Sequence, residues 1–292
     1  MYVVLGANGR AGGATARALV GLGQPVRVVL RRSEQAGAWT NLGADVAIGS
    51  IEDVQSITAA LSNATGAFLL SPAPTSGDPY ERADVVGLAL AQAVRRSGIS
   101  RVVALSSIGA QHRTGTGIIA TLHSLERHLK GTALSMTFLR PGYFVESWEE
   151  VVQAVVSDGL LPSFLEPSQR IPMVSTIDVG HAAARLLVEG FTGERIVELS
   201  GPQDWSANDV AAAFSQVLDR TVKAAFVPVE VRADVLANEG IPSQVAEALL
   251  GMYEGLANGR VSVEAGTQRR SGSVPLIDAV ERIVISAGGA PA

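Results

Sequence analysis

Short apolar segments alternate along the first half of the chain with longer segments whose apolar residues recur every three or four positions. The apolar segments predict strands at 2–5, 25–30, 44–49, 66–71, 101–107 and 135–141. The segments between them predict helices at 12–22, 33–43, 54–64, 78–98 and 117–131. Asp53 and Asp78 are expected to cap the third and fourth of these helices, and Gly98 to end the fourth. Because strands buried on both faces read as short apolar runs, this alternation predicts an α/β fold with a Rossmann-type doubly wound parallel sheet.

The pattern changes after Pro141. Residues 160–175 contain three prolines and predict a segment that is mostly loop. Asp178 is expected to cap a helix over 179–190. The apolar residues of 194–202 predict a seventh strand, which we expect to return to the sheet.

The remainder of the chain predicts a helix at 206–218, a strand-like segment at 221–229 and two further helical stretches. No internal repeat or low-complexity linker separates the two halves. We therefore expect a smaller α+β lobe that is interleaved with the Rossmann domain. The expected division is a cofactor-binding domain at 1–142, to which 170–200 returns, and a substrate or partner lobe at 143–292.

Three glycines lie between the first strand and the first helix, where residues 6–12 read GANGRAG. In a dinucleotide-binding loop the first glycine permits a tight turn, the second lets backbone approach the pyrophosphate, and the third lets helix pack on strand. The alternative is a purely steric role at the end of a strand. The context of strand, loop and helix favours cofactor binding. The predicted contacts are Gly6, Asn8, Gly9, Arg10, Ala11 and Gly12.

The end of the second strand distinguishes between cofactors. An acidic residue there would bind the ribose hydroxyl of NAD, but this chain has Arg31 and Arg32, with no acid before Glu34. A guanidinium matches a 2′-phosphate, so the sequence favours NADP(H) over NAD(H). The alternative is that both arginines are solvated charges at a strand end.

Composition excludes several classes of protein. Hydrophobic residues make up 47% of the 292 residues and the net charge is −5, which predicts a large core and no basic nucleic-acid-binding face. The chain has no cysteine, so disulfides and thiolate metal sites are excluded. Neither His112 nor His181 has a second metal-ligating residue at a spacing typical of metal sites. No apolar run reaches the roughly 18 to 20 residues that cross a membrane. We expect a cytoplasmic protein with no bound metal.

Several segments together resemble the NmrA-like family of atypical short-chain dehydrogenases, which includes quinone-reductase-like members and redox-sensing regulators. They are GANGRAG, GSIEDVQSITAAL, FLLSP, VVALSSIGA, LHSLERHL, TFLRPGYFVES, IPMVSTIDVGHAAARLL and VELSGPQDWSANDVAAAF. The resemblance covers most of 1–218 and is diffuse beyond about 220. It implies an NADP(H)-binding Rossmann domain with a small C-terminal lobe over the substrate.

The resemblance implies that the glycine loop contacts the pyrophosphate and that Arg31 contacts the 2′-phosphate. The resemblance also implies that Ser71 and Pro72 lie near the ribose. It places the nicotinamide beside Pro141, Gly142, Tyr143 and Phe144. Two departures stand out. The chain has Gly49-Ser50 where relatives often have Gly-Asp, and it lacks the Tyr-x-x-x-Lys pair of typical short-chain dehydrogenases.

The missing pair leaves catalysis open. His123, on the helix after the fifth strand, is a candidate proton donor, or alternatively packs on its helix or binds a ribose hydroxyl. Ser106 ends the fifth strand, where ligands bind in open parallel sheets, so it is a candidate cofactor contact, or alternatively its hydroxyl stabilises the loop. An apolar substrate pocket, or ordinary core packing between lobes, is predicted for Tyr143, Phe144, Trp148 and Phe164.

Two functions remain open at this stage. The first is an NADP(H)-dependent oxidoreductase acting on a small molecule, either a quinone or another carbonyl compound. The second is a non-catalytic NADP(H) sensor that acts through a protein partner. The absent Tyr–Lys pair favours the sensor, and the aromatic second lobe favours the enzyme. A homodimer is compatible with either function.

Overall fold

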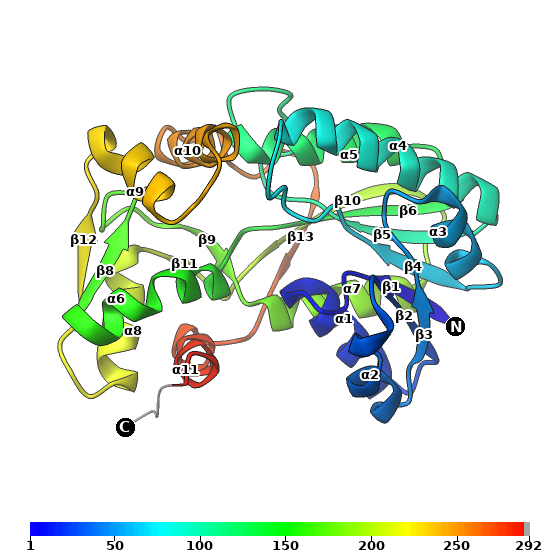
Figure 1. The fold of residues 1–292 in the computed structure, drawn as a ribbon, viewed down its shortest axis with the longest axis horizontal. Coiled ribbons are helices and arrows are strands. Elements are labelled where there is room, and N and C mark those ends of the chain that lie inside the picture. Colours follow the sequence, from blue (N-terminus) through cyan, green and yellow to red (C-terminus); the bar gives the residue numbers. More distant parts are fainter. Residues whose placement is uncertain (289–292) are drawn as a thin grey trace.

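The computed structural model describes residues 1–288, and its centre is a parallel sheet of eight strands. The strand order is β13-β10-β6-β5-β4-β1-β2-β3, with every neighbouring pair parallel (Figure 1). The strands are β1 (Tyr2–Leu5), β2 (Val26–Leu30), β3 (Asp45–Ile48), β4 (Gly66–Leu69), β5 (Arg101–Leu105), β6 (Ser135–Pro141), β10 (Gly193–Ser200) and β13 (Gln268–Ser271). The predicted doubly wound sheet is confirmed.

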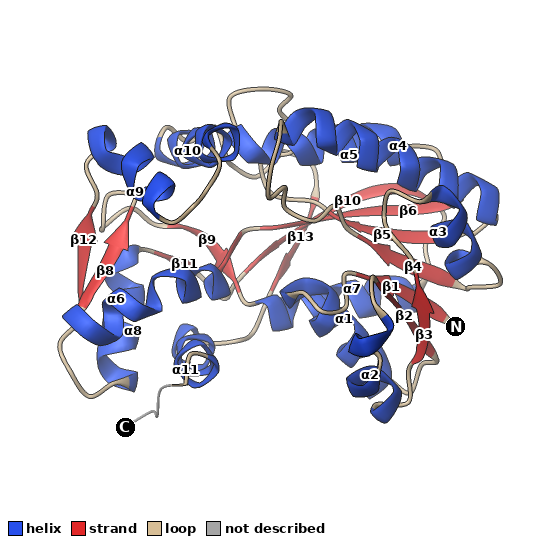
Figure 2. Ribbon diagram, in the orientation of Figure 1, coloured by secondary structure: helices blue, strands red, loops and turns tan. Residues whose placement is uncertain are grey.

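Helices cover both faces of this sheet (Figure 2). One face carries α3 (Val54–Leu61), α4 (Pro79–Ser97) and α5 (Ala120–Leu129). The other carries α1 (Arg10–Gly21), α7 (Thr176–Glu189) and, beside β3, the 3₁₀ turn η1 (Ser33–Gln35) with α2 (Gly37–Asn41). Within residues 1–288, no helix has both the length and the apolar character needed to span a membrane.

Local capping fixes where the helices start and stop. Asp53 accepts a hydrogen bond from the Gln55 amide, and Asp78 accepts one from the Tyr80 amide, so each carboxylate satisfies a free N–H group at a helix start. Gly98 ends α4 with φ +68°, a left-handed conformation that favours glycine. These ends agree with those predicted from the sequence.

The second lobe has its own apolar core, which is built around Trp148, Leu161 and Phe214. Its strands form a two-stranded sheet, β12-β8, and a three-stranded sheet, β11-β9-β7. The strands are β7 (Tyr143–Phe144), β8 (Leu160–Ser163), β9 (Ile171–Val174), β11 (Asp204–Trp205) and β12 (Lys223–Phe226). The helices are η2 (Gly117–Ile119), which joins this lobe to α5, η3 (Val145–Val151), α6 (Val152–Asp158), α8 (Ala207–Val217), η4 (Val229–Val231), α9 (Arg232–Asn238), α10 (Ser243–Ala257) and α11 (Leu276–Ser286).

The chain crosses between the two halves more than once. After β9 it returns through α7 to β10, which pairs with β6, as the predicted seventh strand requires. After α10 it returns again, and β13 adds to the outer side of β10. The sequence did not predict β13, because its residues Gln-Arg-Arg-Ser lack any apolar alternation.

Two local predictions are wrong. The segment 160–175 is not mostly loop, because it contains β8 and β9. Pro162 lies in β8, which is bonded to another strand on one side only, and that is where a sheet tolerates proline. Pro172 lies in β9, whose pairings to β7 and β11 each involve only two residues. Because these strands are short and contain proline, their sequences lack the alternation of apolar and polar residues that predicts a strand.

Asp178 is not the cap of α7. Ser175 is the N-cap, and its Oγ accepts a hydrogen bond from the Ile177 amide. Asp178 lies buried in the first turn, and its carboxylate accepts hydrogen bonds from the amides of Ser273 and Val274, both at 3.0 Å. Asp178 therefore fastens the segment between β13 and α11 to α7. A partner 95 residues away cannot be read from a local capping pattern.

Candidate functional site

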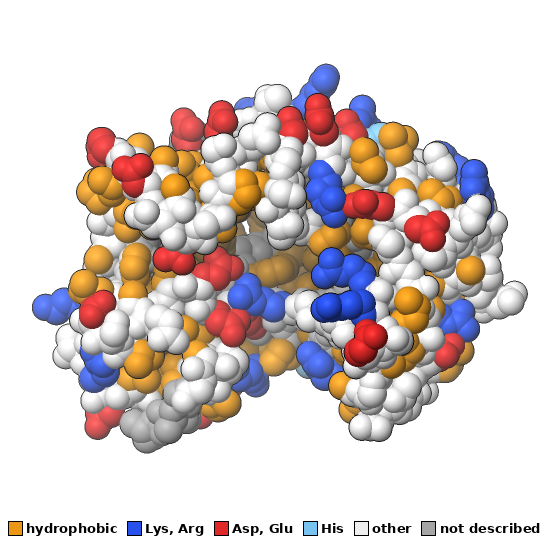
Figure 3. Space-filling model, viewed as in Figure 1, with side chains coloured by type: hydrophobic (Ala, Val, Ile, Leu, Met, Phe, Trp, Pro, Cys, Tyr) orange, Lys and Arg blue, Asp and Glu red, His pale blue; other side chains and the backbone are white. Residues whose placement is uncertain are grey.

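A cavity of about 600 Å³ lies between the carboxyl ends of β4, β5 and β6 and the second lobe. Open parallel sheets bind ligands at this edge, and the volume suits a small molecule. In Figure 3 the surface is hollowed between the two halves, with basic side chains along one side of the hollow. Of the predicted site residues, the cavity is lined by Arg10, Ala11, Ser71, Pro72, Ser106, Pro141, Gly142, Tyr143 and Phe144.

The glycine loop leads from β1 to α1 beside this cavity. Gly6 has φ +68°, and its carbonyl accepts a hydrogen bond from the Gly9 amide at 2.9 Å, which forms the tight turn. A Cβ on Gly12 would lie 2.2 Å from the Gly6 oxygen, so only glycine lets α1 pack this close. Gly9 is the N-cap and offers no side chain, so the first amides of α1 have no side-chain acceptor.

The polar side chains of this loop are already engaged. The Asn8 Oδ1 accepts a hydrogen bond from the Trp39 Nε1 at 2.9 Å. The Arg10 Nη2 lies 3.0 Å from the Glu149 carboxylate, and its Nη1 lies 3.6 Å from that of Glu150. Arg10 thus joins the start of α1 to the second lobe across the mouth of the cavity.

Arg31 and Arg32 follow the end of β2 and are exposed. The register pairs Leu5 with Val29, so Arg31 lies level with the start of the glycine loop on the neighbouring strand. Among residues 1–288, neither guanidinium has a carboxylate within 4 Å. Two unpaired positive charges therefore stand beside the loop.

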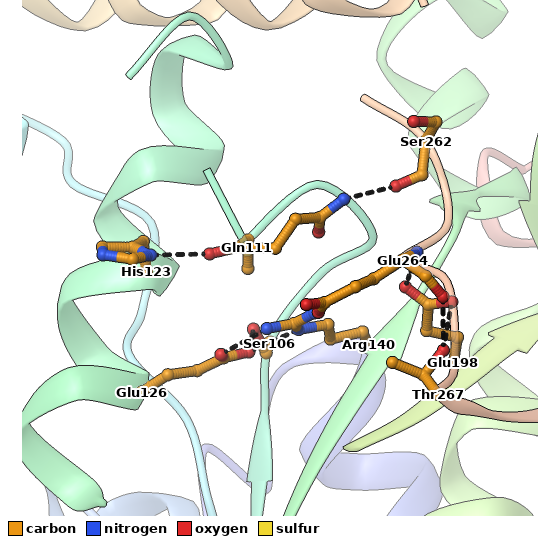
Figure 4. Close-up of polar contacts among 10 residues, drawn as sticks. Ser106, Gln111, His123, Glu126, Arg140, Glu198, Ser262, Glu264 and Thr267 are labelled. Carbon is orange, nitrogen blue, oxygen red and sulfur yellow. Dashed lines mark hydrogen bonds and ion pairs between the residues drawn. The ribbon is translucent and has the colours of Figure 1, made fainter. Parts of the chain in front are cut away.

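The Ser106 end of β5 is tied to a buried ion pair (Figure 4). The Ser106 Oγ donates to Glu126 Oε1 at 2.5 Å, and Arg140 binds both oxygens of Glu126, Nε to Oε1 at 2.7 Å and Nη2 to Oε2 at 2.6 Å. Arg140 is only 2% exposed. Burial alone would lower the pKa of Arg140, but the neighbouring carboxylates of Glu126 and Glu264 more than offset this effect, so the pKa of Arg140 is raised.

The same network extends to the segment between α10 and β13. Arg140 Nη1 lies 2.5 Å from the Glu264 carboxylate. The buried Glu198 carboxylate accepts hydrogen bonds from the Glu264 amide at 2.9 Å and the Thr267 hydroxyl at 2.8 Å (Figure 4). These contacts anchor a segment of the second lobe to β6 and β10, directly behind the cavity wall.

One side of the cavity is polar. The hydroxyls of Tyr143 and Tyr253 lie 3.2 Å apart, and Ser147 and Glu150 line the same side. Burial raises the pKa of Tyr143 well above its ordinary value, with smaller contributions from Tyr253 and Glu150. Burial also raises the pKa of Tyr253, so both tyrosines keep their protons at and well above neutral pH. Most of the other lining residues are apolar, among them Leu70, Pro74, Ile118, Ile119, Leu122, Leu249 and Met252.

The predicted proton donor and two of the predicted pocket aromatics lie outside this cavity. The His123 Nδ1 lies 2.9 Å from the Ala110 carbonyl oxygen, which holds the ring against the loop after β5 (Figure 4). Trp148 is buried in the second-lobe core beside Tyr143. Phe164 packs edge-on against Tyr253, with ring centroids 5.1 Å apart, and faces a second cavity instead.

Sequence reasoning missed Tyr253, Glu150 and the Glu126–Arg140 pair. A signal for the pair existed, because an arginine inside the apolar strand SMTFLRP requires a buried acidic partner. Tyr253 gave no signal, because it lies 110 residues from Tyr143 in a region of ordinary amphipathic helices.

A model of the NmrA-like family matches residues 2–274. This chain belongs to the NmrA-like family. It is 24% identical over 255 residues to an NAD(P)H azoreductase of Xenophilus azovorans, covering 87% of this chain and 86% of that protein.

Two solved structures share the fold. One is the NADPH-dependent quinone oxidoreductase QOR2 of Escherichia coli in complex with NADPH, with a TM-score of 0.81, 20% identity and coverage of 97% of this chain and 99% of that one. The other is the Citrobacter triphenylmethane reductase in complex with NADP(H), with a TM-score of 0.79, 20% identity and coverage of 97% and 100%.

Proposed function

We propose that this family member is an NADP(H)-dependent oxidoreductase that reduces a quinone or another small carbonyl compound by hydride transfer. The observation that carries the proposal is a largely apolar cavity, with one hydroxyl-bearing side, placed directly beside the glycine loop and the start of α1. The reductase activities of the azoreductase and of the two structural neighbours support it.

The residues present fit NADP(H). The amides at the start of α1 and the open space at Gly9 suit a pyrophosphate, and a Cβ on Gly9 would approach only the Gly6 oxygen, at 3.3 Å. Arg31 and Arg32 are free to bind a 2′-phosphate. When bound, the cofactor supplies a hydride. Ser71, Pro72 and the segment from Pro141 to Phe144 would hold its ribose and ring against the cavity.

The two tyrosines supply the polar contact that the substrate needs. A protonated Tyr143 or Tyr253 hydroxyl can donate a hydrogen bond to a substrate oxygen, which stabilises negative charge that develops there during reduction. The apolar lining of the cavity would hold a flat ring and exclude water. This pair would supply a hydrogen bond to the substrate oxygen in a chain that lacks the Tyr-x-x-x-Lys pair of typical short-chain dehydrogenases.

The direct test is NADPH oxidation measured against a panel of quinones, azo compounds and aldehydes. We expect turnover with at least one class of acceptor. Tight NADPH binding without turnover on the whole panel would instead support the redox-sensor function, with the cavity serving a partner.

Arg31→Ala should weaken NADPH binding by about 1 to 3 kcal/mol, because a guanidinium–phosphate hydrogen bond is lost. NADH binding should hardly change, since NADH has no 2′-phosphate. Fluorescence titration with both cofactors measures the difference. Arg95→Ala, at an exposed arginine in the last turn of α4, is the matched control. Equal losses for NADPH and NADH would contradict the assignment of Arg31.

Tyr253→Phe should lower kcat/KM with a quinone about two- to tenfold, the usual cost of one uncharged hydrogen bond, and leave NADPH affinity unchanged. Tyr143→Phe should do the same, and the double variant should cost little more, because the hydroxyls act together. Tyr80→Phe, at a tyrosine outside this cavity, is the control.

The same assay tests His123. Loss of a general acid typically lowers turnover by roughly 10²- to 10⁴-fold. If His123→Ala causes a loss of that size and Tyr253→Phe has no effect, then His123 is the proton donor and the tyrosine assignment fails. Its contact with the Ala110 carbonyl leads us to expect a change in stability and not in turnover.

A further inference from the structure

A second cavity, of about 1210 Å³, lies on the other side of α10 from the main cavity. Leu249, Met252 and Tyr253 face the main cavity, whereas Leu250 and Glu254 face the second one. Its remaining walls come from the loop after β8, from β12, η4 and α9, and from Tyr80 of α4 with the segment at Gly115 and Gly117 (Figure 1). The two cavities therefore share a helix but open to different sides of it.

Arg232 lines this second cavity and is only 8% exposed. Its Nε donates to the Val227 carbonyl at 2.9 Å. Its guanidinium lies 5.5 Å from the ring centre of Phe164 and 5.1 Å from that of Phe226. Among residues 1–288, no carboxylate lies within 4 Å of it, and neither Nη atom has a hydrogen-bond acceptor.

A buried cation without an anion is unusual, because desolvation of the charge is costly. Arg140, which is 2% exposed, is by contrast matched by Glu126 and Glu264. The two aromatic rings offset part of the cost for Arg232, but they leave both Nη atoms without partners. A guanidinium with two free Nη donors matches the two oxygens of a carboxylate.

The surroundings decide which anion fits. Phe226, Val229, Ile241 and Leu250 present apolar surface, which suits a hydrocarbon chain or ring. Exposed acidic residues stand at the same cavity, namely Glu166, Asp234, Glu247 and Glu254. They would repel a multiply charged phosphate more strongly than a single carboxylate. We propose that this cavity binds an apolar monocarboxylate, with its carboxylate on Arg232 and its hydrocarbon part along the apolar wall.

Calorimetric titration tests the site in the full chain saturated with NADPH, so that the cofactor site does not compete. The probes are octanoate and 4-phenylbutanoate, which distinguish an aliphatic from an aromatic ligand, together with their neutral amides. We expect one carboxylate to bind per chain. The matching amide should bind about tenfold more weakly or worse, because the charged hydrogen bonds are lost.

Arg232→Gln should weaken binding of the preferred carboxylate by about tenfold or more, whereas Arg96→Gln, at an exposed arginine on α4, should not. Ala237→Trp keeps Arg232 but fills the cavity from α9, so it should also abolish binding, and thermal unfolding checks that each variant is folded. The proposal is overturned if neither carboxylate binds at about 1 mM, if the amides bind equally well, or if folded Arg232→Gln and Ala237→Trp proteins bind like the wild type.

Discussion

Replacing Arg140 with methionine is expected to lower the free energy of unfolding by about 3–5 kcal/mol, the cost of breaking a buried ion pair by removing one partner. Glu126 is 9% exposed and makes both of its ionic contacts with Arg140. Without the guanidinium, its charge would remain buried with only the Ser106 hydroxyl as a donor. Methionine keeps the unbranched stem as far as the position of Nε, so the variant retains the packing of the stem while it removes the charge.

Urea denaturation of wild type and variants measures this loss. Lys130→Gln removes an ion pair with Glu194 whose lysine is 70% exposed, and it should cost less than about 1 kcal/mol. The double variant Glu126→Gln/Arg140→Met should recover part of the stability, because the uncompensated charge is gone. A loss for Arg140→Met no larger than that of Lys130→Gln would show that the network contributes little.

The consequences reach the cavity, because Ser106 lies both in the network and in the cavity wall. Glu264 and Thr267 are held by the same group of charges, so the return of the chain to β13 depends on it. We therefore expect Arg140→Met to weaken the joint between the two halves as well as the overall fold.

The sequence predicted those parts of the fold that depend on neighbours in the chain. Strands β1 to β6, the caps Asp53 and Asp78 and the stop at Gly98 all follow from local periodicity and hydrogen bonding. Prediction failed where a distant partner decides the structure. Asp178 has the local pattern of a cap, but its carboxylate instead accepts hydrogen bonds from the amides of residues 273 and 274. The segment that forms β13 is a strand because it pairs with the edge of β10.

The candidate site divides in the same way. The glycine loop and Arg31 stand out because a dinucleotide-binding unit is contiguous in sequence. The polar side of the cavity joins Tyr143 to Tyr253, which only the tertiary fold brings together. The sequence groups Phe164 with the predicted pocket residues Tyr143, Phe144 and Trp148. In the fold, Phe164 directly follows β8 and lines the second cavity, on the other side of α10.

The glycine loop supplies the second large effect. Gly9→Val is expected to remove measurable NADPH binding, a loss of more than about 100-fold in affinity, while the protein stays folded. Gly9 has φ −94°, which any residue adopts, and a Cβ there approaches only the Gly6 oxygen, at 3.3 Å. A side chain at Gly9 therefore requires the Gly6 carbonyl to shift by only a few tenths of an ångström. A pyrophosphate requires glycine there, because a branched side chain would occupy the space it needs above the start of α1.

Gly12→Val makes the matched comparison, because a Cβ there would lie 2.2 Å from the Gly6 oxygen and 2.7 Å from that of Leu5. That variant should lose stability, since β1 and α1 cannot move apart without disturbing the sheet and the packing of α7 on α1. Circular dichroism and thermal unfolding measure folding, and fluorescence titration measures NADPH binding. Full NADPH affinity in folded Gly9→Val would show that the loop is a structural turn, and the cofactor assignment would fail with it. The expected pair of results is a Gly9→Val protein that is as stable as the wild type but does not bind NADPH, and a Gly12→Val protein that does not fold. These results would show that Gly9 serves the ligand and Gly12 serves the fold.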